Sequence, residues 1–392
     1  MKYDVIVVGG GPGGAIAAKT CAKEGLKTLL LEKKEFTREK ACAGAVTEKV
    51  LRRFDDIPKD VFERYYHGLT FCVDDEAYTV DSDNRLGGLV CRGKFDSTLV
   101  KMAEMEGAKI KQEKKVIDIV KKDDFSKGVI VKTEEGTEEY NSDIIIGADG
   151  QSSMVRRKLG VFVADWTKVA AQFQYQMKMS SELIDGWIGD RLETYLGGDI
   201  SPTAYAWIFP KKDIVTVGIG ALVSEIRSDN INLKERLNNL IKNHPVASKK
   251  LEGAKIVMTQ GHRITYFGST SKSYFNGAML IGEAAGHALM GTGEGIYYAM
   301  AGGQIAGEWA AKAISSGDVS ENYLKGYGDE WKAEFGEDLE WAVNMRGSQK
   351  RPQGLLKMML RTIKHSPSTK ELLFDYMDGK LVKVLKEIGF IK

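Results

Sequence analysis

The sequence predicts an α/β fold, α+β overall, with a Rossmann-type domain, an antiparallel-sheet domain and a helical C-terminal region. Three observations support this class. An apolar run at residues 3–8 breaks into a glycine cluster and then continues as a helical pattern. Two later apolar runs, at 143–147 and 278–282, also end in small residues and an acid. Between 161 and 268 the sequence is instead typical of antiparallel strands separated by turns.

Length and composition are those of a large globular protein. The 392 residues suffice for two or three domains. Lysine and arginine (56) nearly balance aspartate and glutamate (54), so the net charge of +2 gives no reason to expect nucleic acid as a partner. No apolar run approaches the roughly 18 residues of a membrane span, and we expect no leader segment.

The cysteines predict no metal centre. They show neither a C-x-x-C pair nor a spacing with histidine that is typical of zinc or iron–sulfur sites. We therefore interpret them as reduced thiols of a cytoplasmic protein. The four are Cys21, Cys42, Cys72 and Cys91.

The first glycine cluster predicts a dinucleotide site. Gly9, Gly11 and Gly14 have the G-x-G-x-x-G spacing, which permits a tight turn, close approach of a pyrophosphate and close packing of helix on strand. The next apolar run, at 27–32, ends in Glu32, near the spacing at which an acid accepts ribose hydroxyls. A plain glycine turn is the alternative, but the strand before it and the helix after it favour the nucleotide site.

The second glycine segment, residues 147–150, permits two interpretations. It ends a buried strand and precedes a helix. Asp149 could accept hydroxyls of a cofactor, or it could cap the helix that follows. The sequence alone does not decide between them.

The third segment extends the same pattern over a longer distance. Residues 282–286 end a strand in small residues and Glu283, and a glycine-rich stretch at 291–295 opens a long helix at 296–314. The N-terminus of this helix would direct N–H groups at a ligand. Three such segments, spread over about 290 residues, fit FAD better than NAD, whose site is usually completed within one half of the fold. One face of the helix carries only small residues, suited to close packing: Ala299, Gly303, Ala306, Gly307, Ala310 and Ala311.

The remaining elements complete the α/β part. We expect residues 41–46 to open a helix that runs to Phe54, a hairpin at 67–80 in a different sheet, and a helix from Arg92 to Met105. Strands follow at 109–112, 115–120 and 128–132, with residues 121–127 as a charged loop.

The antiparallel part contains an aromatic strand. Two-residue alternation places Tyr205, Trp207 and Phe209 on one face of this strand. They could form a core face, a wall for a large apolar substrate, or both. The strands are expected at 169–177, 192–196, 205–209, 215–221 and 256–264, with one amphipathic helix at 232–243.

Seven motifs form a set that occurs together in one family. They are Gly9–Gly14, Cys42–Ala45, Arg92 with Phe95-Asp96, Gly147–Gly150, Tyr205–Lys211, Gly282–Gly286 and Thr292–Ile296. This set resembles the geranylgeranyl reductases, which share the p-hydroxybenzoate hydroxylase fold, and it covers roughly residues 1–320. The resemblance implies bound FAD and reduction of isoprenoid carbon–carbon double bonds, in archaeal ether-lipid precursors or in the tail of chlorophyll. Glu283 stands where the family usually has aspartate, and the cysteine segment is closer to the chlorophyll-type branch, so the substrate stays open.

The resemblance also implies residue roles. Cys42 is the candidate proton donor, with an inert packed thiol as the alternative, and His287 is expected to act as a cap or a supporting residue. Arg92 is expected against the cofactor, with a surface ion pair as the alternative. The candidate cofactor-binding residues are Gly9, Gly11, Pro12, Gly13, Gly14, Glu32, Lys33, Ala43, Gly44, Arg92, Asp149, Gly150, Gly282, Glu283, Gly293, Gly295 and Ile296, and the candidate substrate-binding residues are Tyr205, Trp207 and Phe209.

These roles imply a domain organisation and partners. The expected partners are an isoprenoid lipid and an external electron donor: NAD(P)H, ferredoxin or another reduced carrier. The expected domains are FAD-binding parts at 1–66, 91–160 and 271–317, a substrate-domain hairpin at 67–90, the antiparallel-sheet substrate domain at 161–270 and a helical region at 318–392.

The C-terminal tail carries a local charge excess. Residues 349–392 contain ten Lys/Arg and four Asp/Glu. Packing on the substrate domain is one interpretation, and peripheral contact with the inner face of the cell membrane is the other. The apolar positions of the expected helix are Leu355, Leu356, Met359, Leu360 and Ile363, and the basic ones are Lys350, Arg351, Lys357, Arg361 and Lys364.

Other functions share this frame. A flavin monooxygenase or halogenase would show substrate-dependent oxygen uptake, and a membrane-linked flavin electron carrier would pass electrons to a quinone. A flavin-binding protein without catalysis would bind FAD and turn over no polyprenyl substrate.

Overall fold

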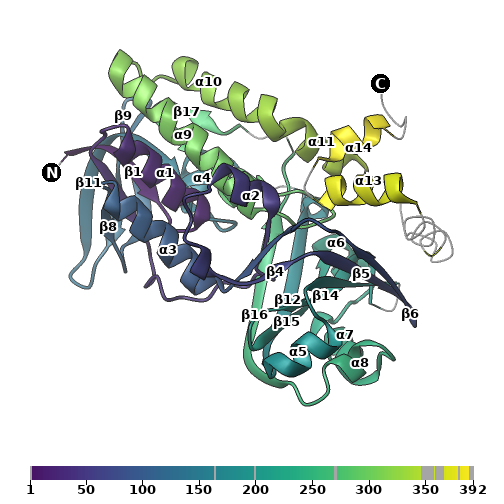
Figure 1. The fold of residues 1–392 in the computed structure, drawn as a ribbon. Coiled ribbons are helices and arrows are strands. Elements are labelled where there is room, and N and C mark those ends of the chain that lie inside the picture. The colour runs from purple at the N-terminus through teal and green to yellow at the C-terminus, as the bar shows by residue number, and fades with distance from the viewer. Residues whose placement is uncertain are drawn as a thin grey trace. The chain divides into compact units, whose positions relative to one another are not determined.

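The chain forms two compact units. The computed structural model describes residues 2–162, 165–197, 200–268, 272–345, 357, 366–377 and 380–387. Unit 1 comprises Met1–Arg38, Gly93–Ala164 and Ile264–Asn344, and unit 2 comprises Glu39–Arg92, Asp165–Arg263 and Met345–Lys392. Both units are thus assembled from segments that lie far apart in the sequence (Figure 1).

Unit 1 is built on an eight-stranded sheet. Strand order is β17-β18-β11-β1-β2-β8, β10 pairs with β11, and β9 pairs with β10. The pairs from β18 to β8 are parallel. The strands are β1 (Lys2–Val8), β2 (Thr28–Leu31), β8 (Lys109–Lys111), β9 (Lys115–Lys122), β10 (Phe125–Lys132), β11 (Thr137–Gly147), β17 (Tyr274–Phe275) and β18 (Ala278–Leu280).

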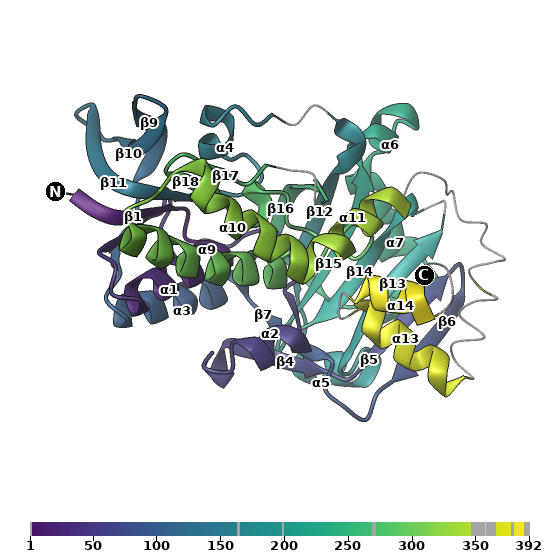
Figure 2. The ribbon, with the colours of Figure 1, turned by 90° about the horizontal axis from the view of Figure 1, so that it is seen from above.

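The hydrophobic pattern of the sequence explains how the strands and helices of unit 1 pack. Four consecutive apolar residues, 5–8, make β1 a strand buried on both faces, as parallel sheets require. Helix α9 packs closely on α1, and α10 lies beside α9 (Figures 1 and 2). The helices are α1 (Pro12–Lys23), α3 (Arg92–Met105), α4 (Met154–Lys158), α9 (Ile296–Ser316), α10 (Glu321–Trp331) and α11 (Glu337–Asn344), with the short segments η3 (Gly282–Ala284) and π-helical η4 (Lys332–Gly336).

Unit 2 is built on a seven-stranded sheet of order β16-β12-β15-β14-β13-β5-β6 and a three-stranded sheet of order β3-β7-β4. The pair β13–β5 is parallel, and the pairs β12–β15, β15–β14 and β14–β13 are antiparallel. The strands are β3 (Ala45–Thr47), β4 (Phe62–Tyr66), β5 (Gly68–Val73), β6 (Glu76–Asp81), β7 (Gly87–Val90), β12 (Val169–Lys178), β13 (Arg191–Gly197), β14 (Ser201–Pro210), β15 (Ile214–Leu222) and β16 (Lys255–Thr265).

One face of the seven-stranded sheet carries the main core of unit 2. Ala206 and Ile208 of β14 belong to this core, together with Leu237 and Leu240 from the buried side of α7. The helices are α2 (Glu48–Arg53), α5 (Ser181–Trp187), α6 (Val223–Ser228), α7 (Leu233–Asn243), α8 (Ala247–Lys250), α13 (Pro367–Met377) and α14 (Leu381–Glu387), with the short segments η1 (Lys59–Val61) and η2 (Trp166–Lys168).

The structure confirms the predicted fold class and most elements. The hairpin β5–β6 belongs to a different sheet from β1, as expected. Two predictions were wrong. Residues 45–47 form strand β3 instead of opening a helix, because pairing with β7 outweighs the helical preference of alanine. Residues 121–127 are not a loop: β9 and β10 continue to a tight turn in which Asp123 has φ +54°.

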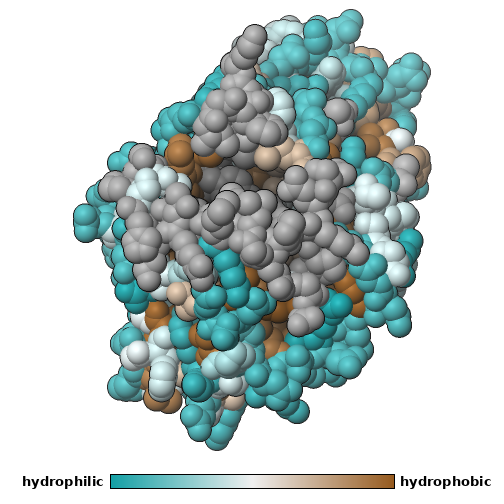
Figure 3. Space-filling model, turned by 90° about the vertical axis from the view of Figure 1, so that its right-hand side faces the viewer, coloured by the Kyte–Doolittle hydropathy of each residue, from teal (hydrophilic) through white to brown (hydrophobic). Residues whose placement is uncertain are grey.

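On the face shown in Figure 3, hydrophilic residues predominate and hydrophobic residues form small separate patches. In the part of the chain that the structure describes, no helix is both long enough and apolar enough to cross a membrane. The predicted tail helix around Leu355–Ile363 lies outside the described residues, except Lys357, which pairs with Asp74 at 2.8 Å and Glu76 at 3.2 Å.

Candidate active site

The carboxyl ends of neighbouring parallel strands meet at one edge of the unit 1 sheet. Val8 lies opposite both Leu31 and Gly147, and Gly147 lies opposite Leu280. The Ile281 N–H donates to the Gly147 carbonyl at 3.0 Å. The three glycine segments therefore lie side by side, although they are spread over most of the sequence, and this edge is where open α/β sheets bind ligands.

Three glycines of the first loop are required by protein packing. Gly9 has φ +107°, and a Cβ there would lie 2.5 Å from the Ala148 oxygen. A Cβ on Gly14 would lie 1.9 Å from the Gly9 oxygen, and one on Gly13 would lie 2.6 Å from the Ala299 oxygen. These residues bring the loop, α1 and α9 together at backbone distance.

Gly11 has a different environment. A Cβ at this position would have no protein atom within 4 Å, and its φ of −78° suits any residue. Neither packing nor backbone conformation therefore requires glycine here. The open space is what close approach of a pyrophosphate needs, so this glycine fits a dinucleotide better than it fits a structural turn.

The helices that begin at this edge lack side-chain caps. Gly11 precedes α1, Gly295 precedes α9, and in neither helix does a side chain cap the first turn or an acid occupy it. By contrast, Asn232 caps α7 and Ser320 caps α10. Uncapped N–H groups and the positive end of the helix dipole suit an anionic ligand.

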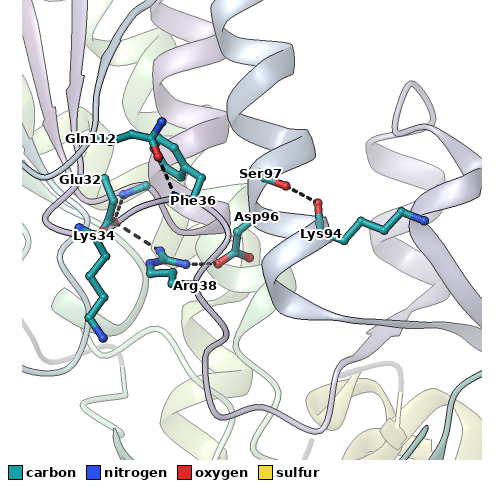
Figure 4. Close-up of polar contacts among 9 residues, drawn as sticks. Glu32, Lys34, Phe36, Arg38, Lys94, Asp96, Ser97 and Gln112 are labelled. Carbon is teal, nitrogen blue, oxygen red and sulfur yellow. Dashed lines mark hydrogen bonds and ion pairs between the residues drawn. The ribbon is translucent and has the colours of Figure 1, made fainter. Parts of the chain in front are cut away.

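A buried network of charges holds Glu32 beside the first loop (Figure 4). One Glu32 oxygen accepts from the Gly10 N–H at 2.8 Å and from Arg38 at 3.3 Å, and the other accepts from the Lys34 N–H at 3.1 Å. Arg38 also bonds to Asp96 of α3 at 3.1 Å. Arg38 thus links the end of β2 to α3. Sequence reasoning missed this residue because it stands in a run of charged residues, with its partner 58 positions away.

Asp149 acts as a helix cap in the structure. Its carboxylate accepts from the Met154 N–H at 2.6 Å, the Val155 N–H at 3.1 Å and the Ser153 hydroxyl. Burial raises the pKa of Asp149. One of the two interpretations of this residue is therefore observed directly, and its contact with a cofactor stays a prediction.

Glu283 lies beside the second glycine segment. Gly150 and Gly282 both have positive φ, +76° and +57°. A Cβ on Gly150 would lie 3.7 Å from a Glu283 carboxylate oxygen. Arg156 donates to the backbone carbonyls of Glu283 and Ala284, each at 3.5 Å. The second and third segments thus place backbone and one carboxylate together at the sheet edge.

His287, which follows the third segment, is packed among aromatic rings. It is fully buried, its ring centroid lies 4.3 Å from that of Trp331 and 5.3 Å from that of Phe335, and neither ring nitrogen has a partner among the described residues. Burial lowers the pKa of His287 to about 3. The expected capping role is therefore not seen.

The Cys42 segment belongs to unit 2. Cys42 is half-buried; its Sγ accepts from the Gly44 N–H at 3.4 Å, and its carbonyl accepts from Gln174 at 3.4 Å. Gly44 has φ +87°, and a Cβ there would lie 2.2 Å from the Val90 oxygen. Glycine is thus required for this turn, which holds the thiol near its own backbone.

The aromatic strand has the predicted alternation. Trp207 and Phe209 lie in one apolar cluster, with Tyr205 packed against it, on the opposite face from Ala206 and Ile208. The Trp207 ring covers Gly218 of β15, where a Cβ would lie 2.2 Å from it. The same cluster includes Ala43 and Ala45 from the Cys42 segment and Leu373 and Phe374 of α13. The structure therefore joins the aromatic face to the Cys42 segment within unit 2.

The predicted site residues divide between the units. Lys33 is exposed, whereas Arg92 is buried, which argues against a surface ion pair. Unit 1 contains Gly9, Gly11, Pro12, Gly13, Gly14, Glu32, Lys33, Asp149, Gly150, Gly282, Glu283, Gly293, Gly295 and Ile296, and unit 2 contains Cys42, Ala43, Gly44, Arg92, Tyr205, Trp207 and Phe209. Among the described residues, no group of three His, Cys, Asp or Glu side chains could hold a metal ion.

A parallel sheet with glycine segments gathered at its carboxyl edge is typical of enzymes that bind a dinucleotide such as FAD. Comparison with known proteins agrees with this class. An FAD-binding domain model matches residues 2–197, and a geranylgeranyl reductase catalytic domain model matches residues 169–262. The prediction of FAD as the cofactor is confirmed.

Similarity to individual proteins identifies the family. The digeranylgeranylglycerophospholipid reductase of Methanosarcina acetivorans is 32% identical over 357 residues, 87% of this chain and 83% of the relative. The enzyme of the same name from Methanocaldococcus jannaschii is 34% identical over 343 residues, 86% of this chain and 84% of the relative. The chain therefore belongs to the geranylgeranyl reductase family, as its motifs indicated.

Solved structures share the fold. A geranylgeranyl bacteriochlorophyll reductase-like protein from Thermoplasma acidophilum superimposes with a TM-score of 0.84 at 24% identity, covering 98% of this chain and 99% of its own. The flavin-dependent brominase Bmp2 superimposes with a TM-score of 0.75 at 17% identity, covering 97% and 94%. Reductases and halogenases thus share this frame, and the fold alone does not separate them.

Proposed function

We propose that this enzyme saturates carbon–carbon double bonds in the geranylgeranyl chains of a glycerophospholipid, an archaeal ether-lipid precursor. The names of its relatives support this substrate class. The structural observation that carries the proposal is the apolar cluster of unit 2, which combines Trp207 and Phe209 with Ala43 and Ala45 from the Cys42 segment. An isoprenoid chain has no group to hydrogen-bond, so apolar walls beside a proton donor are what its reduction needs.

The proposed cofactor contacts follow from the geometry of unit 1. The open space at Gly11, with the uncapped first turn of α1, would receive the pyrophosphate. Glu32 would accept the adenosine ribose hydroxyls, and the N-terminus of α9 after Gly293 and Gly295 would face the flavin. Unit 1 would then be the core of the FAD-binding domain and unit 2 that of the substrate domain. The unit boundaries differ from the expected domains, because residues 39–66 belong to unit 2 and residues 318–344 to unit 1.

The residues of unit 2 would supply the proton and the apolar walls that the reduction needs. Bound FAD, once reduced, supplies a hydride to one alkene carbon. Cys42 would give its thiol proton to the other carbon, so that the bond is saturated. Tyr205, Trp207 and Phe209 would hold the isoprenoid chain and keep water away from the reacting carbons.

Electrons must come from outside the chain. We propose an external donor, either NAD(P)H, ferredoxin or another reduced carrier, because the motifs account for a single dinucleotide. We also propose a cytoplasmic location with peripheral membrane contact, since the substrate is too apolar to cross water freely and the tail is locally basic. Flotation with anionic liposomes tests this contact: the full chain should float at low salt and be released at high salt.

Anaerobic assays test the main proposal. Protein reduced with dithionite should add two hydrogens per double bond to a digeranylgeranyl glycerophospholipid, measured by mass spectrometry. Geranylgeraniol and geranylgeranyl diphosphate serve as comparison substrates. Recovery of all three unreduced contradicts the proposal, and substrate-dependent oxygen uptake in air would favour a monooxygenase.

A further inference from the structure

A lysine amine is buried directly beneath the Cys42 segment. Lys211 follows β14, in the turn to β15, and only 2% of the residue is exposed. Its Nζ donates to the Ala43 carbonyl at 3.2 Å and bonds to the Thr216 hydroxyl. Both acceptors are neutral, and among the described residues no carboxylate forms an ion pair with this amine. In the sequence this lysine ends the Tyr205–Lys211 motif, and nothing in the motif indicates that its amine is buried.

Such an amine is costly to keep, because burial disfavours its charged form. Burial lowers the pKa of Lys211, and the groups that oppose this effect are the Cys91 and Cys42 thiols, followed by Glu39 and Glu63. In their thiolate forms, these two cysteines are thus the charge partners with the strongest effect on this amine. Burial also raises the pKa of Cys91, while Lys211 lowers it.

The backbone ties the amine to Cys42 in particular. Lys211 bonds to the carbonyl of the residue that follows Cys42. A Cβ on Gly44 would lie 3.2 Å from the Lys211 Cε, so the turn that carries the Cys42 thiol rests on the lysine side chain. The same turn holds the thiol through the Gly44 N–H. Lys211 and Cys42 are therefore parts of one fixed arrangement.

We propose that Lys211 is a positioning residue that returns the proton to Cys42 in each turnover, a role that rests on the function proposed above. When the alkene is reduced, three bonds would break: its π bond, the bond that held the hydride in reduced FAD, and the Cys42 S–H bond. Two C–H bonds would form in their place, one to the hydride and one to the thiol proton. Cys42 is left as a thiolate. The Lys211 ammonium gives it a proton, and the neutral amine then takes a proton from water.

Substitutions of Lys211 separate charge from proton transfer. Lys211→Gln keeps a donor for the Ala43 carbonyl but carries no charge. Alkylation of Cys42 by iodoacetamide at neutral pH should therefore slow by at least about threefold, and the pH profile of this alkylation should move to higher pH. Lys211→Arg keeps a permanent charge that arginine does not give up, so alkylation should stay fast while turnover falls about tenfold or more. Peptide mapping distinguishes Cys42 from the other cysteines.

The exposed neighbour Lys212 supplies the matched control, because Lys212→Gln should change neither the alkylation profile nor turnover. Flavin absorbance and melting temperature report folding of each variant. An unchanged alkylation profile in Lys211→Gln overturns the proposal, and so does full turnover in Lys211→Arg. The alkylation readout needs no substrate, so failure of the wild-type protein to reduce any polyprenyl lipid would count against the proposed function instead.

Discussion

The predicted site residues of the two units offer different kinds of group. Unit 1 offers backbone: glycines at the sheet edge and the uncapped first turns of α1 and α9. Unit 2 offers side chains: the Cys42 thiol, the Lys211 amine and the aromatic face around Trp207. The predicted site of unit 1 depends on glycines that lack a Cβ atom, and that of unit 2 depends on the side chains that are there. Added atoms should therefore disturb either the packing or the cofactor site of unit 1, whereas the predicted site of unit 2 should respond above all to changes of charge and shape.

The largest effect is expected at Gly14. In Gly14→Ala the new Cβ would lie 1.9 Å from the Gly9 oxygen, which is backbone and cannot rotate away. We expect a loss of about 3 kcal/mol of stability, seen as a lower melting temperature of the FAD-free protein. The control is Gly186→Ala, where no atom lies within 4 Å of the added Cβ. Equal melting of the Gly14 variant and wild type would refute the role of backbone packing.

A substitution of Gly11, in the same loop, should weaken FAD binding and leave stability unchanged. Gly11→Val adds atoms to a space that no protein atom occupies, so the FAD-free protein should keep its melting temperature. The affinity for FAD should fall about 100-fold, or about 2.7 kcal/mol, because the side chain would occupy the place of the pyrophosphate. Flavin fluorescence on titration measures this. Full FAD occupancy of the purified variant would show that the loop assignment is wrong.

The contrast between the units also explains what could be predicted. The strand, loop and helix from Lys2 to Lys23 are local in sequence, and glycine spacing states their geometry directly. The helices at Arg92 and Ile296 and the strands of the larger antiparallel sheet were likewise predicted, because their periodic patterns are continuous.

What the sequence did not predict depends on distant partners. The three-stranded sheet β3-β7-β4 consists of short strands whose preference is decided by pairing. Arg38 is one charge among many until folding brings Asp96 within 3.1 Å of it. Lys211 is an ordinary lysine in sequence, and only the structure shows that its amine is enclosed. Side-chain sites are therefore harder to predict from sequence than backbone sites.

His287 breaks the simple contrast, because it is a buried side chain next to a backbone-built segment of unit 1. In the folded protein its pKa is lowered to about 3, so it stays neutral at pH 5, whereas in the unfolded chain it takes up a proton near pH 6.5. Stability should therefore fall as the pH drops below about 6.5, and at pH 5 this one residue should account for about 2 kcal/mol of the loss.

The variant His287→Phe isolates this contribution. Between pH 7 and pH 5 its free energy of unfolding should decrease by about 2 kcal/mol less than that of the wild type, because phenylalanine cannot be protonated. Denaturant unfolding at the two pH values measures the difference, and groups that titrate in both proteins cancel. If both proteins lose the same stability, His287 must find a partner for its proton in the folded state.

The smallest expected effect concerns shape in unit 2. The Trp207 ring covers Gly218, so Trp207→Phe should leave part of that glycine uncovered and loosen the apolar wall. We expect kcat/KM for a digeranylgeranyl lipid to fall about tenfold, or about 1.4 kcal/mol, while FAD affinity changes by less than about twofold.

Gly218→Ala alone should lower kcat/KM further, because its Cβ would lie 2.2 Å from the tryptophan ring. Combined with Trp207→Phe, the added methyl should fill the space that the smaller ring leaves, so the double variant should be more active than Gly218→Ala. Additive effects would show that the two side chains do not compete for the same space. A fall of FAD affinity in step with turnover would show that this face does not bind the isoprenoid chain.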